Sequence, residues 1–306
     1  MRHRAHRTHL AGWLLVAATV AACGRAERVR SSGAPGAGSI RVTDDAGRTV
    51  VLPAPAQRVV SLAPSSTELL FAIGAGPQVV GRTTWCDYPP AAKLVPVVGE
   101  GLNPNVEAVT ARRPDLVVLY RSALTETAAA QLGRLGIPAV ILKQDRLEDI
   151  ARDARVLGSL TGHVAGGDSV ATPLERFLAA SPPTLSHPAR LVFVVWDNPP
   201  IVIAGGSFLD QLATLAGAEN TFHDIAGASA TVSLETIAAR DPDFIAVVSD
   251  SSGAGVPAWS RRPEWQTVRA VRLHRFIVLG GDLFGRPSPR APEAVRRLRS
   301  FIEAGR

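Results

Sequence analysis

One short pattern occurs twice in this chain, and it constrains the fold more than any other feature. The stretch from Glu107 to Leu119 aligns without a gap with the stretch from Glu235 to Val247. Each copy is typical of a helix end, a Pro-Asp break and a buried strand, because proline cannot continue a helix and an unbroken apolar run suits a parallel strand. A chance match of a common α/β connection is the alternative. The repeat predicts two α/β lobes of similar construction, each with a glutamate near a helix start. Five identities carry the match: Glu107/Glu235, Ala111/Ala239, Arg112/Arg240, Pro114/Pro242 and Asp115/Asp243.

The N-terminus predicts an exported protein. Three arginines precede an apolar run from Leu10 to Ala22, which has the length of a signal peptide and is too short for a permanent membrane span. The run ends in Val20-Ala21-Ala22-Cys23, which resembles the lipobox of bacterial lipoproteins. We predict a signal peptide over residues 1–22 and a lipid on Cys23, with an ordinary secretory signal as the alternative. Residues 23–39, rich in Gly, Ala, Ser and Arg, are predicted to form a flexible tether.

Charge, cysteine content and histidine spacing argue against a nucleic-acid partner, an intramolecular disulfide and a metal site. The 306 residues carry a formal net charge of +6, and part of that excess lies in the leader. No basic stripe with interleaved aromatic residues occurs, so nucleic acid is not an expected partner. With Cys23 lipidated, Cys86 has no intramolecular disulfide partner and is expected to be a buried thiol, with a metal ligand as the alternative. The histidines after the leader lack ligand spacing, and no metal site is predicted: His163, His187, His223 and His274.

The rest of the chain alternates apolar strands with helices, which predicts an α/β fold with mainly parallel sheets. We place an N-terminal lobe at residues 40–146, a bridging helical segment at 147–183 and a C-terminal lobe at 184–306. Glycines at 162, 166 and 167, together with Pro173, predict that the bridging segment is interrupted or kinked. The spacing of Ser65 and Glu68 is that of a capping box, which accounts for Glu68 without a function.

Several segments together resemble the helical-backbone substrate-binding proteins of ABC importers, and most of all their cobalamin-binding branch. The resemblance covers about residues 56–303. It implies two α/β lobes joined by a stiff helix, a ligand held between them, and delivery of that ligand to an ABC permease by a monomeric protein with no cofactor of its own. The segments are Thr83-Thr-Trp-Cys-Asp-Tyr-Pro-Pro90, Gly101-Leu-Asn103, the two repeated units, and Asp282-Leu-Phe-Gly-Arg286.

The resemblance also implies which residues contact a corrinoid. The aromatic residue at the position of Trp85 contacts the ligand in that family, whereas a core or surface tryptophan is the alternative. From the second matching loop, the candidates are Asp282, Phe284 and Arg286, although that loop lacks an aromatic residue and a carboxylate of the cobalamin-binding pattern. Trp196 is a further candidate, since ligands of open α/β sheets lie beyond the carboxyl ends of strands.

Glu107 and Glu235 match the glutamates that, one in each lobe, dock arginines of the permease in this family. Their ordinary explanation is that an acid in the first turn of a helix complements the helix dipole. Two such residues at a fixed separation would set register and orientation more than affinity. We therefore expect both to contact the permease.

Two other functions remain open at this point. A haem or ferric-siderophore carrier of the same family is the first; haem could use Tyr88 or Tyr120 as an axial ligand, although Tyr88 is better explained by packing in a turn. A secreted enzyme is the second possibility, but the chain has no Gly-x-Ser-x-Gly, Ser-x-x-Lys, His-Glu-x-x-His or Walker motif. The sequence therefore predicts a lipid-anchored protein outside the cytoplasm that binds a corrinoid and is not an enzyme.

Overall fold

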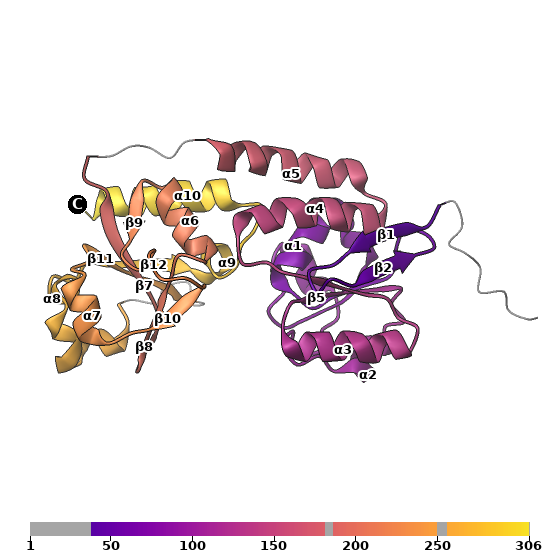
Figure 1. The fold of residues 1–306 in the computed structure, drawn as a ribbon, viewed down its shortest axis with the longest axis horizontal. Coiled ribbons are helices and arrows are strands. Elements are labelled where there is room, and N and C mark those ends of the chain that lie inside the picture. The colour runs from indigo at the N-terminus through magenta and orange to yellow at the C-terminus, as the bar shows by residue number, and fades with distance from the viewer. Residues whose placement is uncertain (1–37, 181–185, 250–255, 306) are drawn as a thin grey trace, which may run out of the picture. The chain divides into compact units, whose positions relative to one another are not determined.

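The computed structural model describes residues 38–180, 186–249 and 256–305. The predicted signal peptide, nearly all of the tether, Cys23 and the predicted boundary at residue 183 lie outside these ranges. Within them, no helix combines the length and apolarity that a membrane crossing requires. The colours of Figure 1 follow the chain from the N-terminal lobe in purple and magenta to the C-terminal lobe in orange and yellow.

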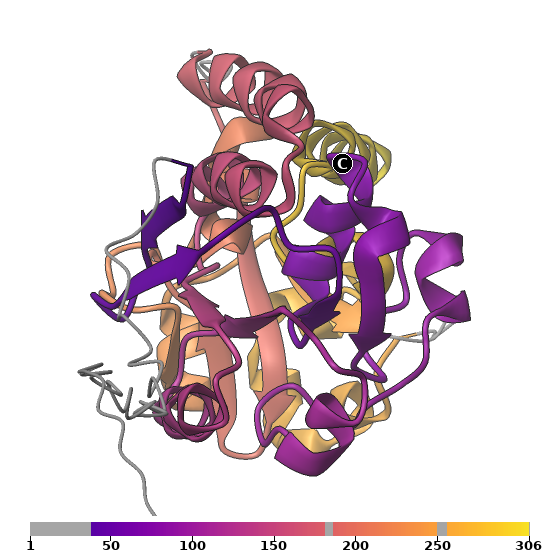
Figure 2. The same cartoon turned by 90° about the vertical axis from the view of Figure 1, so that its right-hand side faces the viewer.

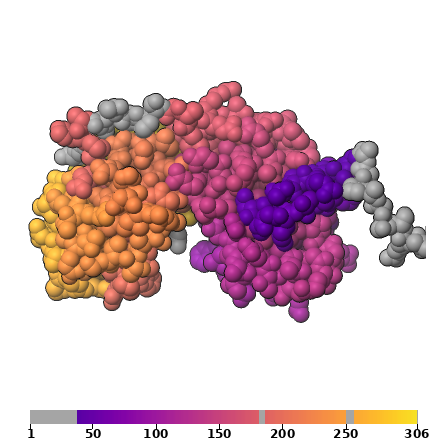
Figure 3. Space-filling view, in the orientation of Figure 1, coloured from indigo at the N-terminus to yellow at the C-terminus, as the bar shows by residue number. Residues whose placement is uncertain are grey.

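The N-terminal lobe is built on a sheet of four parallel strands in the order β4-β3-β5-β6. The central strands are buried along nearly their whole length, as expected of parallel strands covered on both faces. The antiparallel hairpin of β1 and β2 lies on the surface of this lobe (Figure 3). The strands are β1 (Ile40–Thr43), β2 (Thr49–Leu52), β3 (Val59–Ser61), β4 (Val79–Arg82), β5 (Leu116–Tyr120) and β6 (Ala139–Leu142). The helices are α1 (Pro64–Ala72), α2 (Val106–Thr110) and α3 (Ala123–Arg134), with short 3₁₀ turns at Gly76–Gln78 and Pro90–Leu94.

The C-terminal lobe has a mixed sheet around β7. The strands β9, β11 and β12 continue it in parallel, whereas β8 and β10 extend it in antiparallel fashion. The α/β class with mainly parallel sheets is thus confirmed. The strands are β7 (Ala189–Asp197), β8 (Pro200–Ile203), β9 (Ala218–Asn220), β10 (Ser229–Thr231), β11 (Phe244–Ser249) and β12 (Phe276–Gly280). The helices are α6 (Phe208–Leu215), α7 (Leu234–Ala239), α8 (Arg269–Arg272), α9 (Gly281–Phe284) and α10 (Ala291–Ala304), with 3₁₀ turns at Ala258–Arg261 and Pro263–Thr267.

The sequence repeat corresponds to one structural unit present in both lobes. The helices α2 and α7 are each followed by a residue with a left-handed backbone, Arg113 (φ 48°) and Asp241 (φ 42°), at matching positions of the repeat. The strands β5 and β11 come next. The repeated aspartates fasten each unit to the neighbouring strand by accepting a backbone N–H bond: Asp115 from Arg58 at 2.9 Å and Asp243 from Arg190 at 3.0 Å. The predicted duplication is therefore present in the fold.

Two helices, α4 (Leu147–Thr161) and α5 (Val164–Ala179), form a hairpin in the segment that follows the N-terminal sheet. They lie side by side in Figures 1 and 2, with α4 packed on α1 and α5 in contact with α10. The break occurs at Gly162, whose left-handed φ of 79° ends α4. Gly166 and Gly167 lie inside α5, where they do not break the helix. A Cβ atom at Gly166 would lie 2.0 Å from the carbonyl oxygen of Ile73, so glycine permits close packing there.

Candidate functional site

Two exposed tryptophans stand at the carboxyl ends of strands, one in each lobe. Trp85 follows β4 and is 60% exposed, and Trp196 lies near the end of β7 and is 58% exposed. The Nε1–H of Trp85 donates to Glu100 at 2.6 Å, and that of Trp196 donates to the carbonyl of Asn198 at 2.9 Å. The polar edge of each indole is therefore satisfied while much of its apolar surface faces solvent. This arrangement suits contact with a large apolar ligand.

A pocket of about 240 Å³ lies beside Trp196. The pocket is located where β7 and β11 end, next to the point at which the order of the parallel strands reverses. In open α/β sheets, ligands usually bind at such a point. Trp259 contributes one wall and packs against Trp265 in a tilted arrangement, with ring centroids 4.1 Å apart. Asp197 lines the pocket and pairs with Arg262. The sequence interpretation missed Trp259, although an aromatic residue in a loop that follows a strand was an available signal.

Arg286 contacts the N-terminal lobe. Its Nη1 donates to the carbonyl oxygen of Trp85 at 2.9 Å, and its Nη2 donates to the carboxylate of Asp87. The side chain of Arg286 is only 12% exposed. Asp282 from the same loop is exposed, and its backbone carbonyl accepts a hydrogen bond from Arg290. The structure therefore brings Trp85 and Arg286 together, through a contact between the lobes.

The structure corrects the expectation for Phe284. Its side chain is 1% exposed and belongs to the apolar core together with Leu283. The short helix α9 turns both of these residues inward and leaves Asp282 nearer the surface. A core position offers no surface to a ligand, so Phe284 supports the loop from beneath.

Glu68 also differs from its sequence interpretation. The helix α1 begins at Pro64, its N-cap is Ala63, and no side chain caps it, so the capping-box interpretation is wrong. The Glu68 side chain is 2% exposed and forms a bidentate ion pair with Arg290, with Nε to Oε1 at 2.6 Å and Nη2 to Oε2 at 3.0 Å. Buried carboxylates require such a partner, but a partner 222 positions away leaves no local trace in the sequence.

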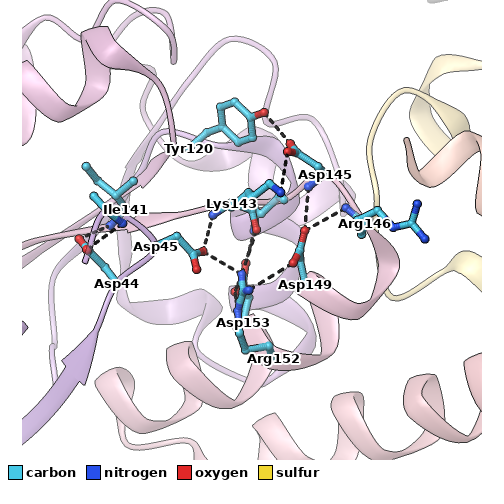
Figure 4. Close-up of polar contacts among 12 residues, drawn as sticks. Asp44, Asp45, Tyr120, Ile141, Lys143, Asp145, Arg146, Asp149, Arg152 and Asp153 are labelled. Atoms are coloured by element: carbon cyan, nitrogen blue, oxygen red, sulfur yellow. Dashed lines mark hydrogen bonds and ion pairs between the residues drawn. The ribbon is translucent and has the colours of Figure 1, made fainter. Parts of the chain in front are cut away.

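Both tyrosines that could have ligated iron are engaged. The guanidinium of Arg290 lies 3.6 Å from the centroid of the Tyr88 ring. The hydroxyl of Tyr120 donates to Asp145 at 2.7 Å (Figure 4). Burial, followed by the hydrogen bond and charge of Asp145, raises the pKa of Tyr120 to about 12. Because iron binds the deprotonated phenolate, this environment disfavours Tyr120 as an axial ligand.

The two repeated glutamates occupy equivalent, exposed positions. Glu107 lies in the first turn of α2 and Glu235 in the first turn of α7. Other side chains cap these helices, because Asn105 accepts from the N–H of Ala108 and Ser233 from that of Thr236. A hydrogen bond with Ser233, then one with its own backbone, lowers the pKa of Glu235. The N-caps of α2 and α7 are therefore Asn105 and Ser233, and the charged form of Glu235 is favoured by its bonds with Ser233 and its own backbone.

Cys86 is buried, with its sulfur 3.1 Å from the hydroxyl of Thr83. Across the described ranges, no group of three or more His, Cys, Asp or Glu residues is arranged to hold a metal ion. The environment of Cys86 is thus that of a small packed thiol.

Comparison with known proteins places this geometry in a family. A family profile named periplasmic binding protein matches residues 59–283. The chain belongs to the periplasmic binding protein family. Members of this family bind substrates for import and are not enzymes. The loop of Trp85, both repeated units and most of α9 fall within the matched range.

Similar proteins of this family include both vitamin B12 and haem binders. The vitamin B12-binding protein of Pectobacterium atrosepticum is 31% identical over 253 residues, covering 80% of this chain and 88% of that protein. An ABC transporter substrate-binding lipoprotein of Bacillus subtilis is 29% identical over 95% of both chains. Among solved structures, the vitamin B12-binding protein of Vibrio cholerae (25% identity, 82% and 98% coverage) has a TM-score of 0.67. The apo haem-binding protein of Roseiflexus sp. RS-1 (26% identity, 82% and 99% coverage) has a TM-score of 0.72. The fold is thus shared by carriers of both ligands.

Proposed function

We propose that this periplasmic binding protein captures cobalamin or a related corrinoid between its lobes and delivers it to an ABC permease. The observation that carries the proposal is the pair of exposed tryptophans, Trp85 and Trp196, at strand carboxyl ends in the two lobes. The relatives named vitamin B12-binding proteins support the same ligand.

A corrinoid suits these tryptophans because its flat ring system offers two broad faces. Full burial of one indole against such a face contributes about 2 kcal/mol or more at ~25 cal/mol per Å². The pocket beside Trp196, at about 240 Å³, has room for part of such a ligand, such as an amide side chain or a base. Tryptophan and valine side chains line it together with the carboxylate of Asp197 and other polar atoms, so it offers both apolar and polar surface to groups of that kind.

Haem is the second candidate, and the similarity to the Roseiflexus haem-binding protein favours it. The state of the tyrosines argues against it. Tyr120 is hydrogen-bonded to Asp145 with a raised pKa, and the ring of Tyr88 is covered by Arg290. We therefore prefer a ligand that needs no phenolate from the protein.

Titration of the mature chain, made soluble by Cys23→Ser, with cobalamin and separately with haem distinguishes the two ligands. Tryptophan fluorescence is the readout. Cobalamin is expected to quench it saturably, with the effect reduced in Trp85→Phe and in Trp196→Phe. Saturable quenching by haem alone would reassign the ligand, and the absorption spectrum of the complex would then report whether a tyrosine binds iron.

We also propose that Glu107 and Glu235 dock the permease and that a lipid on Cys23 holds the protein at the outer face of a membrane. The exposed, equivalent positions of the two acids support docking. The similarity to the Bacillus subtilis lipoprotein, which spans 95% of this chain, supports the anchor. Cys23 itself lies outside the described residues.

A further inference from the structure

Two arginines between α9 and α10 connect the lobes. Arg286 and Arg290 belong to the C-terminal lobe, and their guanidinium groups bind residues of the N-terminal lobe. Arg290 reaches Glu68 on α1, and Arg286 reaches Asp87 and the carbonyl of Trp85 in the loop that follows β4. The partners are separated by 199 to 222 positions in the chain.

Glu68 is the centre of this contact. Both of its carboxylate oxygens bind Arg290, and one lies 3.8 Å from Nε of Arg286. Burial opposes the charged form of Arg290, yet the hydrogen bond and charge of Glu68 outweigh it and raise the pKa of Arg290. A bidentate arginine–carboxylate pair fixes relative orientation as well as distance. Separation of the lobes would leave the buried carboxylate without its partner, which is costly.

Arg286 contacts Trp85 through the backbone of that residue. One nitrogen holds the Trp85 carbonyl while another holds Asp87, two residues further along. Burial acts to raise the pKa of Asp87, but the hydrogen bond and charge of Arg286 prevail and lower it. The indole ring of Trp85 is held by Glu100, which accepts a hydrogen bond from the indole N–H. The backbone of Trp85 is thus held from the C-terminal lobe and its ring from the N-terminal lobe.

We propose that Arg286 and Arg290, with Glu68 and Asp87, form an inter-lobe clamp that sets the spacing of the lobes and the position of Trp85 before the ligand arrives. Arg286 is then a positioning residue. The link to corrinoid binding rests on the function proposed above, whereas the clamp itself does not. Its consequence is preorganisation, because a cleft of preset width loses less conformational entropy on binding and favours a ligand of one thickness.

Distances between the lobes test the clamp in the absence of any ligand. Spin labels are placed at Thr127→Cys on α3 and at Glu264→Cys in the 3₁₀ turn Pro263–Thr267, since both positions are exposed while Cys86 is buried. With the clamp intact, one narrow distance distribution is expected. Replacing the buried pair by Glu68→Gln with Arg290→Gln, which removes both charges and so leaves neither without a partner, should broaden or shift the distribution.

The matched control is Arg240→Ala. Arg240 pairs with Asp224 and lies 4.4 Å from the Phe222 ring, so it reproduces the contacts of Arg290 within one lobe. Its distance distribution should match that of the parent. If the double variant, with both Glu68→Gln and Arg290→Gln, also keeps the parent distribution while it remains folded by circular dichroism, the clamp is refuted.

The role of Arg286 is tested with fluorine-labelled tryptophan and NMR, with the Trp85 resonance assigned through Trp85→Phe. Arg286→Ala is expected to shift or broaden the Trp85 resonance in ligand-free protein and to weaken cobalamin binding about tenfold, while Arg286→Lys restores part of both. An unchanged Trp85 resonance with lost affinity would instead make Arg286 a direct ligand contact. If cobalamin fails to bind the parent protein, the ligand-free resonance and distances still decide the clamp, and only the proposed ligand falls.

Discussion

At the scale of single residues, Trp85 and Trp196 are held in different ways. The indole N–H of Trp85 bonds Glu100 and its carbonyl bonds Arg286 of the other lobe, whereas the indole N–H of Trp196 bonds within its own loop, to Asn198. Both leave aromatic surface exposed. Trp85 is thus coupled to the arrangement of the lobes, and Trp196 is held locally.

Trp85→Ala is expected to weaken cobalamin binding by about 2 kcal/mol, roughly a thirtyfold rise in Kd, because the ligand loses a buried aromatic face. Calorimetric titration measures this. Trp85→Phe should retain most of the affinity, and the exposed Leu273→Ala is the control. Equal affinities for Trp85→Ala and the parent protein would remove Trp85 from the site.

A second residue-scale feature is the buried carboxyl of Asp153 on α4 (Figure 4). It accepts hydrogen bonds from Arg152 at 2.9 Å and from Gln144 at 3.1 Å. Burial is the largest influence and outweighs Arg152, so that the pKa of Asp153 is raised to about 7. The native state therefore holds a proton on Asp153 at pH values where the unfolded chain has released it.

The folded pKa of Asp153 lies above its unfolded value, so its stabilising contribution is complete at low pH and is lost as pH rises through about 7. The free energy of unfolding is expected to fall between about pH 4 and about pH 7, from the unfolded pKa of 3.8 to the folded one, and Asp153→Asn should flatten this dependence. Urea unfolding across that range tests the point. Asp168→Asn, an exposed acid on α5, is the control. A parent protein whose stability is flat over this range would contradict the raised pKa.

At the scale of elements, glycine sets how closely the α4–α5 hairpin packs. The backbone of α5 passes so near the end of α1 that any Cβ at Gly166 would meet the Ile73 carbonyl. Gly167 is similarly placed, with a Cβ position 2.6 Å from the carbonyl oxygen of Ala154. Helix propensity alone would penalise these glycines, but tertiary packing selects them.

Gly166→Ala is expected to lower the free energy of unfolding by about 1–3 kcal/mol, because the backbone of α5 or of Ile73 must move. Gly133→Ala in α3 is the matched control, since its Cβ position has no neighbour within 4 Å. That change should raise stability by about 0.5–1 kcal/mol. Thermal unfolding of both variants measures the contrast, and equal shifts would contradict the packing argument.

The repeated unit is the second informative element. The same cap, helix, left-handed residue and Pro-Asp turn present Glu107 in one lobe and Glu235 in the other. A duplicated backbone delivers two exposed acids in matching local settings, and in each unit another side chain, Asn105 or Ser233, is the N-cap.

Charge reversal at both positions, Glu107→Arg with Glu235→Arg, is expected to abolish uptake in cells while ligand affinity in solution stays within about twofold of the parent. Each single reversal should reduce uptake less. Glu126→Arg, an exposed acid in the first turn of α3, is the control. Normal uptake by the double variant would remove the docking proposal.

At the scale of the whole molecule, several connections restrain the two lobes. The helix α4 packs on α1 while its N-terminal end bonds the second lobe, where Arg146 donates to Gly205 and Leu147 to Gln211. The ion pair between Glu68 and Arg290 adds a second tie. The proposed lipid at Cys23 would fix the assembly to a membrane through the segment preceding Ile40.

Cys23→Ser is expected to release the protein from the membrane fraction into the soluble extracytoplasmic fraction, since the lipid would be the anchor. Cell fractionation with immunoblotting measures this, and cobalamin affinity should not change. A variant that stays with the membrane fraction would show that another contact holds it.

Local patterns were sufficient to predict the α/β class, the duplicated unit and an interruption between helices. Strand burial, proline breaks and glycine ends act within a few residues, so they leave a readable periodicity. The exact position of that interruption was not predictable, because Gly162, Gly166 and Gly167 are chemically identical in sequence. Only the packing partner distinguishes the glycine that ends α4 from those that let α5 approach its neighbours.

For the candidate site, the sequence by itself was enough to select two tryptophans, Trp85 and Trp196, and the paired glutamates as candidate functional residues. It could not determine the roles of Glu68, Phe284 or Arg286. Tertiary structure decided that Glu68 pairs with Arg290, that Phe284 is core, and that Arg286 binds the backbone of Trp85. The physical reason is range: caps and strand periodicity depend on near neighbours, whereas burial and ion pairing depend on residues some 200 positions away.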